Sequence, residues 1–347
     1  MEINDILRDA VAQDASDIIL ICNQPVSFRI NGDIVPQSEK KLTTEDTRRL
    51  LSQIFDESEQ RELNNLIDTG DSDFALSVRG LGRFRVNAYR QRNSMAAVIR
   101  VVKFNIPDPA EIGIPPEVMD LAGLRKGFVL VTGAAGSGKS TTLACLIDAI
   151  NSTRSGHIIT LEDPVEFIHH HKHSIVSQRE IFLDTENYDT ALRAALRQSP
   201  DVILLGEMRD FETIRTAMTA AETGQLLLSS LHTNGVSKAV DRIIDVFPAN
   251  QQQQIRTQLS MVLEAVVSQQ LVPSVDGGLI PAFEVMRVNP AIRNMIRAGK
   301  VKQIDAEIYA GQKQGMVSMD ASLQQLHAAG RITPETARLY SDNFNLG

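Results

Sequence analysis

The chain has few of the residues from which disulfides, zinc sites and membrane spans are built. Its 347 residues include only two cysteines, Cys22 and Cys145, which lie far apart in the sequence. Separate cysteines exclude a zinc site made of cysteine pairs, and reduced thiols are their expected state. No apolar run approaches the roughly 20 residues that a membrane-spanning helix needs. We therefore expect no direct membrane insertion.

The sequence also lacks an excess of positive charge and an export signal. Its 35 basic and 43 acidic residues give a net charge of −8. Binding of nucleic acid through bulk charge is therefore not expected. The first ten residues, MEINDILRDA, contain no basic region followed by an apolar core, so no signal peptide is expected. The composition is that of a globular cytoplasmic protein with two or three domains.

Residues 1–103 predict a small α+β domain. The Asn31-Gly32 turn between VSFRI and DIVP is typical of a hairpin, and TTEDTRRLLSQIF (43–55) has a threonine cap and helical spacing. Three more strands are predicted, with the sequences SDFALSV, GRFRVNAYRQ and SMAAVIRVV. Residues 104–117 hold four prolines and little periodicity, so they are predicted to be a linker.

From residue 118 onward, buried apolar strands alternate with helices. The strands have the sequences FVLVTG, HIITLED, DVILLGE and QLLLSSLHT. This alternation predicts a mostly parallel sheet with helices on both faces, and ligands beyond the carboxyl ends of the strands. After Pro248 we expect only helices, beginning with the stretch QQQQIRTQLSMVLEAVVSQQLV.

The stretch GAAGSGKST (133–141) directly follows an apolar strand and precedes a predicted helix. It consists of Gly133, Ala134, Ala135, Gly136, Ser137, Gly138, Lys139, Ser140 and Thr141. Backbone N–H groups of such a loop surround phosphate oxygens, the lysine reaches the β- and γ-phosphates, and the serine hydroxyl ligates Mg²⁺. The loop therefore predicts a bound nucleoside triphosphate with Mg²⁺.

Acidic side chains stand at the ends of two of the predicted strands. LEDPVE places Glu162, Asp163 and Glu166 after one strand, and DVILLGEMRD places Glu207 at the end of another. Carboxylates there can hold Mg²⁺ through water or polarise an attacking water. Helix caps and solvated loops are the alternative interpretation of each acid taken alone.

Three other groups are candidates for the same chemistry. His232 follows the fourth strand, where an imidazole could sense the γ-phosphate, although a lone histidine is more often structural. The cluster HHHKH (169–173) resembles a metal site, but nothing fixes its geometry, so a mobile surface loop is expected. Three arginines on neighbouring strands could act as trans-acting fingers at a subunit boundary. They are Arg83, Arg85 and Arg100.

Over nearly its whole length the chain resembles the secretion-type ATPases, the hexameric motors of type II secretion and type IV pili. GAAGSGKST is similar to their Walker A motif, ITLEDPVEF to the Asp box, DVILLGEMRD to Walker B and GQLLLSSLHT to the His box. The pilus retraction branch fits best, because assembly and secretion members usually carry two cysteine pairs and further N-terminal domains. AIRNMIRAGK (291–300) also resembles the AIRNLIRE-type motif of the retraction branch.

The resemblance implies an N-terminal PAS-like domain (1–103), a linker (104–117) and a RecA-like ATPase core with a helical C-terminal region (118–347). It implies a homohexamer that binds ATP and Mg²⁺ at the inner face of the cell membrane. Its partners would be a pilus inner-membrane platform protein and paralogous pilus ATPases. Either Glu162 or Glu166 could be the general base, and the family pattern favours Glu166. The His box departs from the family at Gln225, where a histidine is usual, so His232 becomes the sensor candidate.

The segment NPAIRNMIRAGK predicts a capped helix with two faces. One face would pack on the domain, and Arg293, Arg297 and Lys300 would form a basic stripe on the other. The stripe could transmit hydrolysis to the platform protein or to another subunit. Four alternatives remain for the whole chain: an accessory retraction ATPase, a secretion or pilus assembly ATPase, a nucleotide-gated scaffold and a P-loop small-molecule kinase.

Overall fold

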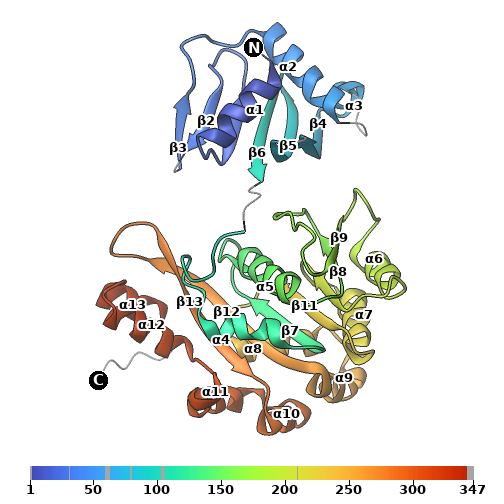
Figure 1. The fold of residues 1–347 in the computed structure, drawn as a ribbon, viewed down its shortest axis with the longest axis vertical. Helices are drawn as coiled ribbons and strands as arrows, with labels where there is room; N and C mark the ends of the chain where they lie inside the picture. Colours follow the sequence, from blue (N-terminus) through green and yellow to red (C-terminus); the bar gives the residue numbers. More distant parts are fainter. Residues whose placement is uncertain are drawn as a thin grey trace. The chain divides into compact units, whose positions relative to one another are not determined.

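The structure is a computed structural model that describes residues 2–30, 32–58, 63–78, 80–102, 106–208 and 210–341. The chain divides into two compact units, Met1–Asn105 and Ile106–Gly347 (Figure 1). Each unit has its own hydrophobic core and is described by itself. Within the described residues, no helix combines the length and the apolar character needed to span a bilayer.

The first unit is an antiparallel sheet packed against helices. Its strand order is β3-β2-β1-β6-β5-β4. The strands are β1 (Asp17–Leu20), β2 (Ser27–Ile30), β3 (Asp33–Pro36), β4 (Asp71–Val78), β5 (Gly82–Gln91) and β6 (Ser94–Val102), and the helices are α1 (Ile3–Ala12), α2 (Thr44–Glu57) and α3 (Leu63–Thr69). The predicted strands and the capped helix are present: Thr43 and Asp46 form a capping box at the start of α2. Helix α3 was not predicted, and Asn31 of the predicted turn lies outside the described residues.

The second unit is built on a seven-stranded sheet with the order β13-β12-β7-β11-β10-β8-β9. The strands are β7 (Gly127–Thr132), β8 (His157–Glu162), β9 (Ile175–Glu180), β10 (Val202–Leu205), β11 (Leu226–Leu231), β12 (Leu263–Pro273) and β13 (Leu279–Arg287). All neighbouring pairs are parallel except β12 and β13. The mostly parallel sheet predicted from the sequence is thereby confirmed.

Helices cover both faces of this sheet, as the buried strand sequences predicted. In β7, Phe128 and Leu130 face one core, whereas Val129 and Val131 face the other. The first core also contains residues of α6 (Tyr188–Ala195), α7 (Phe211–Glu222), α8 (Val236–Asp245) and α9 (Ala249–Val262). The second contains residues of α4 (Pro116–Met119) and α5 (Lys139–Thr153). A strand buried on both faces has no polar alternation, which is why these strands are apolar runs.

The expectation of helices alone after Pro248 is wrong. Helix α9 ends at Val262, and β12 begins at the next residue, where it pairs with the central strand β7 and with β13. Because no glycine or proline separates α9 from β12, the sequence offers no local signal for the change. The valines of EAVVSQQLV fit a buried strand better than a helix.

The remaining C-terminal segments are helical as predicted. They are α10 (Pro290–Arg297), α11 (Ile304–Ala310), α12 (Met319–Ala328) and α13 (Pro334–Tyr340). The Asn289 side chain caps α10 by accepting the backbone N–H of Ile292 at 2.9 Å, and Pro290 occupies the first turn. Ile292 and Ile296 are buried, so the predicted packed face of this helix is confirmed.

The predicted basic stripe of α10 is wrong for Arg293. Its Nη1 donates to the backbone oxygens of Ser260, Met261 and Leu263 at 2.8, 3.1 and 3.3 Å, and its Nη2 lies 2.9 Å from Glu264. These carbonyls lie at the C-terminal end of α9, where the helix itself provides no backbone N–H groups to pair with them. Arg293 is therefore the C-terminal cap of α9, and only the other two stripe residues are exposed.

Candidate functional site

The predicted phosphate loop joins β7 to α5. Gly136 and Gly138 have φ values of +76° and +89°, which residues with a side chain rarely adopt. A Cβ atom on Gly133 would lie 2.2 Å from the backbone oxygen of Gln269, and one on Gly138 would lie 2.8 Å from its Nε2. The loop therefore needs glycine at position 136 for its backbone conformation, and at positions 133 and 138 also because β12 lies against them.

Lys139 is the first residue of α5 and is only 7% exposed. Its Nζ donates to the backbone oxygens of Gly133 and Ala134 at 2.9 and 2.8 Å. Burial lowers the pKa of Lys139, and the nearby carboxylates of Glu207 and Glu166 partly offset this. The ammonium group and the positive end of the α5 dipole act at the same place, which suits a phosphate anion.

The predicted acids lie at the carboxyl ends of β8 and β10. Glu162 ends β8, Glu166 is exposed in the loop that follows, and Glu207 follows β10 with 8% exposure. Burial raises the pKa of Glu162 to about 7, against the hydrogen bonds that it accepts from Thr160 and Gln178. Its carboxyl group therefore titrates near neutrality.

His232 follows β11 and lies beside one of these acids. Its Nε2 is 3.3 Å from Oε2 of Glu207. Side chains from β10 and β11 thus meet at the same edge of the sheet. A change in the charge or position of the Glu207 carboxylate can therefore alter the position of the His232 ring through this contact.

One cavity of about 420 Å³ collects most of the predicted site. Its lining includes Ala135, Gly136, Gly138, Lys139, Ser140, Thr141, Glu162, Glu166, Glu207 and His232. Asp163 lines it as well, so the structure brings the phosphate loop, the four predicted acids and the histidine together. A second cavity, of about 480 Å³, shares Gly138 and Thr141 with the first and extends along β12 and β13.

The predicted arginines belong to the first unit, whereas the described cavity is formed by residues of the second. Arg85 lies opposite Arg100 across β5 and β6, and Arg83 lies two residues away on the same face. Arg85 pairs with Asp73 at 2.9 Å, and Arg100 pairs with Asp17 at 3.2 Å. The three arginines therefore share one face of the sheet.

The histidine-rich segment is not simply a surface loop. His169 is only 6% exposed and lines the cavity of 420 Å³, and its Nδ1 has no hydrogen-bond partner in the described part of the chain. Burial lowers the pKa of His169 to about 4, so its ring is neutral at physiological pH. Sequence spacing missed this because only the fold shows which histidine turns inward. No group of three metal-binding side chains occurs among the described residues.

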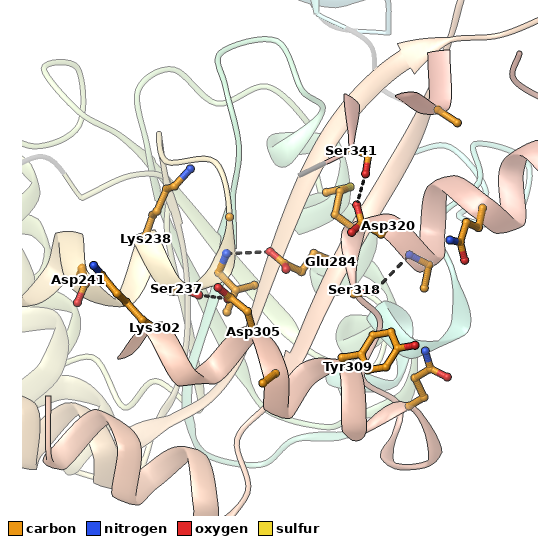
Figure 2. Close-up of a pocket in the computed structure, with 18 residues that line it drawn as sticks. Ser237, Lys238, Asp241, Glu284, Lys302, Asp305, Tyr309, Ser318, Asp320 and Ser341 are labelled. Carbon is orange, nitrogen blue, oxygen red and sulfur yellow. Dashed lines mark hydrogen bonds between the residues drawn. The ribbon is translucent and has the colours of Figure 1, made fainter. Parts of the chain in front are cut away.

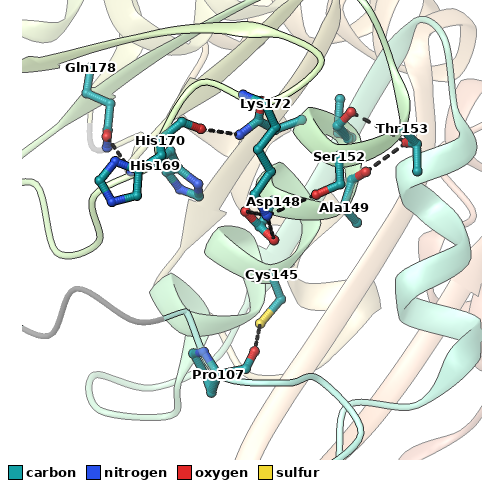
Figure 3. A network of polar contacts seen from close by, with 12 residues as sticks. Pro107, Cys145, Asp148, Ala149, Ser152, Thr153, His169, His170, Lys172 and Gln178 are labelled. Atoms are coloured by element: carbon teal, nitrogen blue, oxygen red, sulfur yellow. Dashed lines mark hydrogen bonds and ion pairs between the residues drawn. The ribbon is translucent and has the colours of Figure 1, made fainter.

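The same segment is fastened to α5, as Figure 3 shows. Asn151 is fully buried; its Nδ2 donates to the backbone oxygen of His170 at 2.7 Å, and its Oδ1 accepts the N–H of Lys172 at 3.2 Å. The Nζ of Lys172 lies 2.8 Å from both carboxylate oxygens of Asp148. The segment after the acidic loop is thus attached to the helix that begins at Lys139.

Strand β12 holds two parts of the site through consecutive residues. Oγ of Ser268 accepts the N–H of Gly235 at 2.9 Å, just after His232. The side chain of Gln269 points the other way, and its Oε1 accepts the hydroxyl of Thr142 in α5 at 2.7 Å. Neither residue belongs to a recognisable motif, because its role depends on the pairing of β12 with β7.

A third cavity, of about 820 Å³, lies beside the start of α8 (Figure 2). Charged side chains of both signs line it, including Lys238, Lys302, Asp241 and Asp305. Within it Ser237 donates a hydrogen bond to Asp305. No residue of the phosphate loop lines this cavity, which is therefore separate from the cavity of about 420 Å³.

Residues 1–328 match the family described as type II/IV secretion system protein. This chain belongs to that family. It is 41% identical to the type IV pilus retractation ATPase PilT of Pseudomonas aeruginosa, over 97% of each chain. It is also 40% identical to the type IV pilus ATPase PilU of the same organism, over 99% of this chain and 90% of PilU.

Among solved structures, the chain is similar to the crystal structure of the pilus retraction motor PilT with bound ADP. The identity is 44%, the TM-score is 0.90, and 99% of this chain and 98% of that chain are covered. The family is therefore that of the secretion and pilus ATPases, as the motifs indicated.

Proposed function

We propose that this family member is a hexameric ATP hydrolase that drives the retraction of type IV pili. The supporting observation is the cavity in which the phosphate loop, four carboxylates and His232 converge. The similarity to PilT, a retraction ATPase, supports the pilus as the structure on which this ATPase acts. The nucleoside part of ATP would extend past Gly138 into the adjoining cavity.

Each site residue has a role in this proposal. Lys139 and the loop N–H groups bind the phosphates. Ser140 and Glu207 would hold Mg²⁺, Glu207 through water, since hydroxyl and carboxylate oxygens are the donors that this ion prefers. The ion, when bound, neutralises charge on the phosphates. Glu166 would polarise the attacking water, because the family pattern favours it and because it lines the same cavity as Lys139 and Glu207.

The arrangement of the domains is part of the same proposal. Residues 1–103 would form the PAS-like domain, residues 104–117 the linker and residues 118–347 the RecA-like ATPase domain. ATP would lie between the domains of a ring, where Arg83, Arg85 and Arg100 could reach it from another subunit. The ring would act on an inner-membrane platform protein at the cytoplasmic side of the membrane.

An accessory retraction ATPase is the second candidate. It is supported by the 40% identity to PilU, which is nearly equal to the 41% identity to PilT. The two candidates would use the same site for ATP hydrolysis and differ only in their role in the cell. A main motor would be needed for retraction whenever pili are made, whereas an accessory ATPase would be needed only beside another motor.

The test is ATP turnover by the wild type and three variants. Lys139→Ala should lose nucleotide affinity, because the lysine contacts phosphate in the ground state. Glu166→Gln and Glu207→Gln should still bind ATP but lose about 10²–10⁴-fold in rate, because they act in the transition state. Full activity in both glutamine variants would refute the assignment. A deletion strain that keeps surface pili but does not twitch would support the cellular role.

A further inference from the structure

Gln178 joins the two ends of the loop that carries Glu166. It lies on β9, and its Oε1 accepts the N–H of His169 at 2.7 Å. Its Nε2 donates to the backbone oxygen of Phe167 at 2.8 Å and to Oε1 of Glu162 at 3.4 Å. One carboxamide thus holds the carboxylate before the loop and the backbone immediately after Glu166.

The far side of this loop is fixed independently. Asn151 binds the backbone of His170 and Lys172, and Asn151 belongs to α5, whose first residue is Lys139. Gln178 fixes the near side against β9, which pairs in register with β8. The position of Glu166 relative to the phosphate loop therefore depends on Asn151, on Gln178 and on Glu180, whose Oε2 accepts the N–H of Val165 at 3.1 Å. Of these three side chains, Gln178 is the one that also contacts the carboxylate of Glu162.

We propose that Gln178 is a positioning residue that sets the place of the Glu162 and Glu166 carboxylates relative to the phosphate loop. The inference rests on the proposed function, ATP hydrolysis at this cavity. Gln178 is not among the described residues that line the cavity. Its loss should therefore displace the carboxylates without removing a nucleotide contact.

The expected signature is a loss of kcat without a matching loss of affinity. A base must lie within hydrogen-bond reach of the attacking water, and a displacement of about 1 Å can cost on the order of 10²-fold in rate. Nucleotide affinity depends mainly on Lys139 and the loop N–H groups, which Gln178 does not touch. A residue that only supported the fold would lower affinity and rate together.

The experiment compares full-length variants by steady-state ATP hydrolysis and by calorimetry with ADP. Gln178→Met has a similar volume and removes all three hydrogen bonds. Gln178→Glu keeps the acceptor for the His169 N–H but loses both donations. Gln198→Glu is the matched control, because Gln198 is exposed and its replacement by glutamate changes the charge by the same amount. Both Gln178 variants should lose about 10- to 100-fold in kcat, with the Kd of ADP changed by less than about threefold.

Two outcomes would overturn the inference. One is a folded Gln178→Met with a kcat within about twofold of the wild type. The other is a loss of ADP affinity as large as the loss of rate. If Gln178→Met does not fold, as judged by circular dichroism, Gln178→Glu is judged by the same criteria. Lys139→Ala distinguishes failure of the proposed ATP site from failure of the role of Gln178. If Lys139→Ala is active, the proposed site is refuted. If Lys139→Ala is inactive and Gln178→Met is active, only the role of Gln178 is refuted.

Discussion

The guanidinium of Arg293 lies 2.9 Å from the carboxylate of Glu264, across the junction between α10 and the start of β12. Both side chains are less than a third exposed. The same guanidinium donates hydrogen bonds to three backbone carbonyls at the end of α9. An arginine that resembled part of a surface stripe in the sequence is therefore bound within its own domain.

Replacing Arg293 by alanine should destabilise the second unit. The variant leaves three carbonyls, two of them partly buried, and the Glu264 carboxylate without their charged donor, which costs about 1–3 kcal/mol in the free energy of unfolding. Urea denaturation of Arg293→Ala and of the exposed control Lys300→Ala measures the difference. Equal stability of the two variants would show that the cap contributes nothing.

Stability should depend on pH through Glu162. Its pKa is about 7 in the folded chain against an ordinary value of 4.5, so the folded state binds a proton that the unfolded state has released. The stabilisation of the folded state by this bound proton is therefore fully present below pH 4.5, and it is lost as the pH rises through about 7. Glu162→Gln removes it, so the variant should gain stability relative to the wild type across this window.

The measurement is the urea midpoint of both proteins at about pH 5 and about pH 8. Burial lowers the pKa of His169, which acts on stability in the opposite sense, but this residue is shared by the two proteins and its effect cancels in the difference. A difference that stays constant with pH would mean that Glu162 is ionised throughout.

Gly133→Ala should abolish nucleotide binding. Gly133 has φ +149°, and the new Cβ would meet the Gln269 backbone oxygen at 2.2 Å, which only a shift of the loop or of β12 can relieve. Gly224→Ala is the control, because Gly224 has φ +102° with no atom within 4 Å of the new Cβ. Backbone strain alone costs about 1–3 kcal/mol at either position. Calorimetry with ADP should show binding to the control alone.

The three arginines should make activity depend on assembly. If Arg83, Arg85 or Arg100 reaches nucleotide in a neighbouring subunit, specific activity will rise with protein concentration. Mixing an arginine-to-alanine chain with Lys139→Ala should restore part of the activity at mixed interfaces, because each chain supplies what the other lacks. A monomer with a concentration-independent rate would contradict this.

The sequence predicts what depends on local chemistry. The phosphate loop, the strand-end acids and the capped α10 helix each carry their signal within about ten residues. The change from α9 to β12 carried none, because no glycine or proline separates the helix from the strand. β9 was missed for a similar reason, since IVSQRE is a short and largely polar strand.

The supporting residues of the site could not be found from local pattern. Gln178 and Gln269 act because strand register brings them beside the acidic loop and the phosphate loop, and register is a property of the folded sheet. Helical spacing gave the face of α10 that Arg293 occupies, but not the carbonyls of α9 that lie against it. The motif therefore identifies the chemistry, and the fold identifies what holds it in place.

Strand β12 tolerates changes of length at its tip but not in its middle. Because Ser268 and Gln269 face opposite sides, one added residue before them would turn both contacts away from their partners. The tip is different: Gly277 and Gly278 have open space around their α-carbons. A peptide inserted there would leave the register of the strand intact, so Ser268 and Gln269 would keep their partners, whereas Asp276 and Gly277, which line the cavity of about 480 Å³, would be displaced.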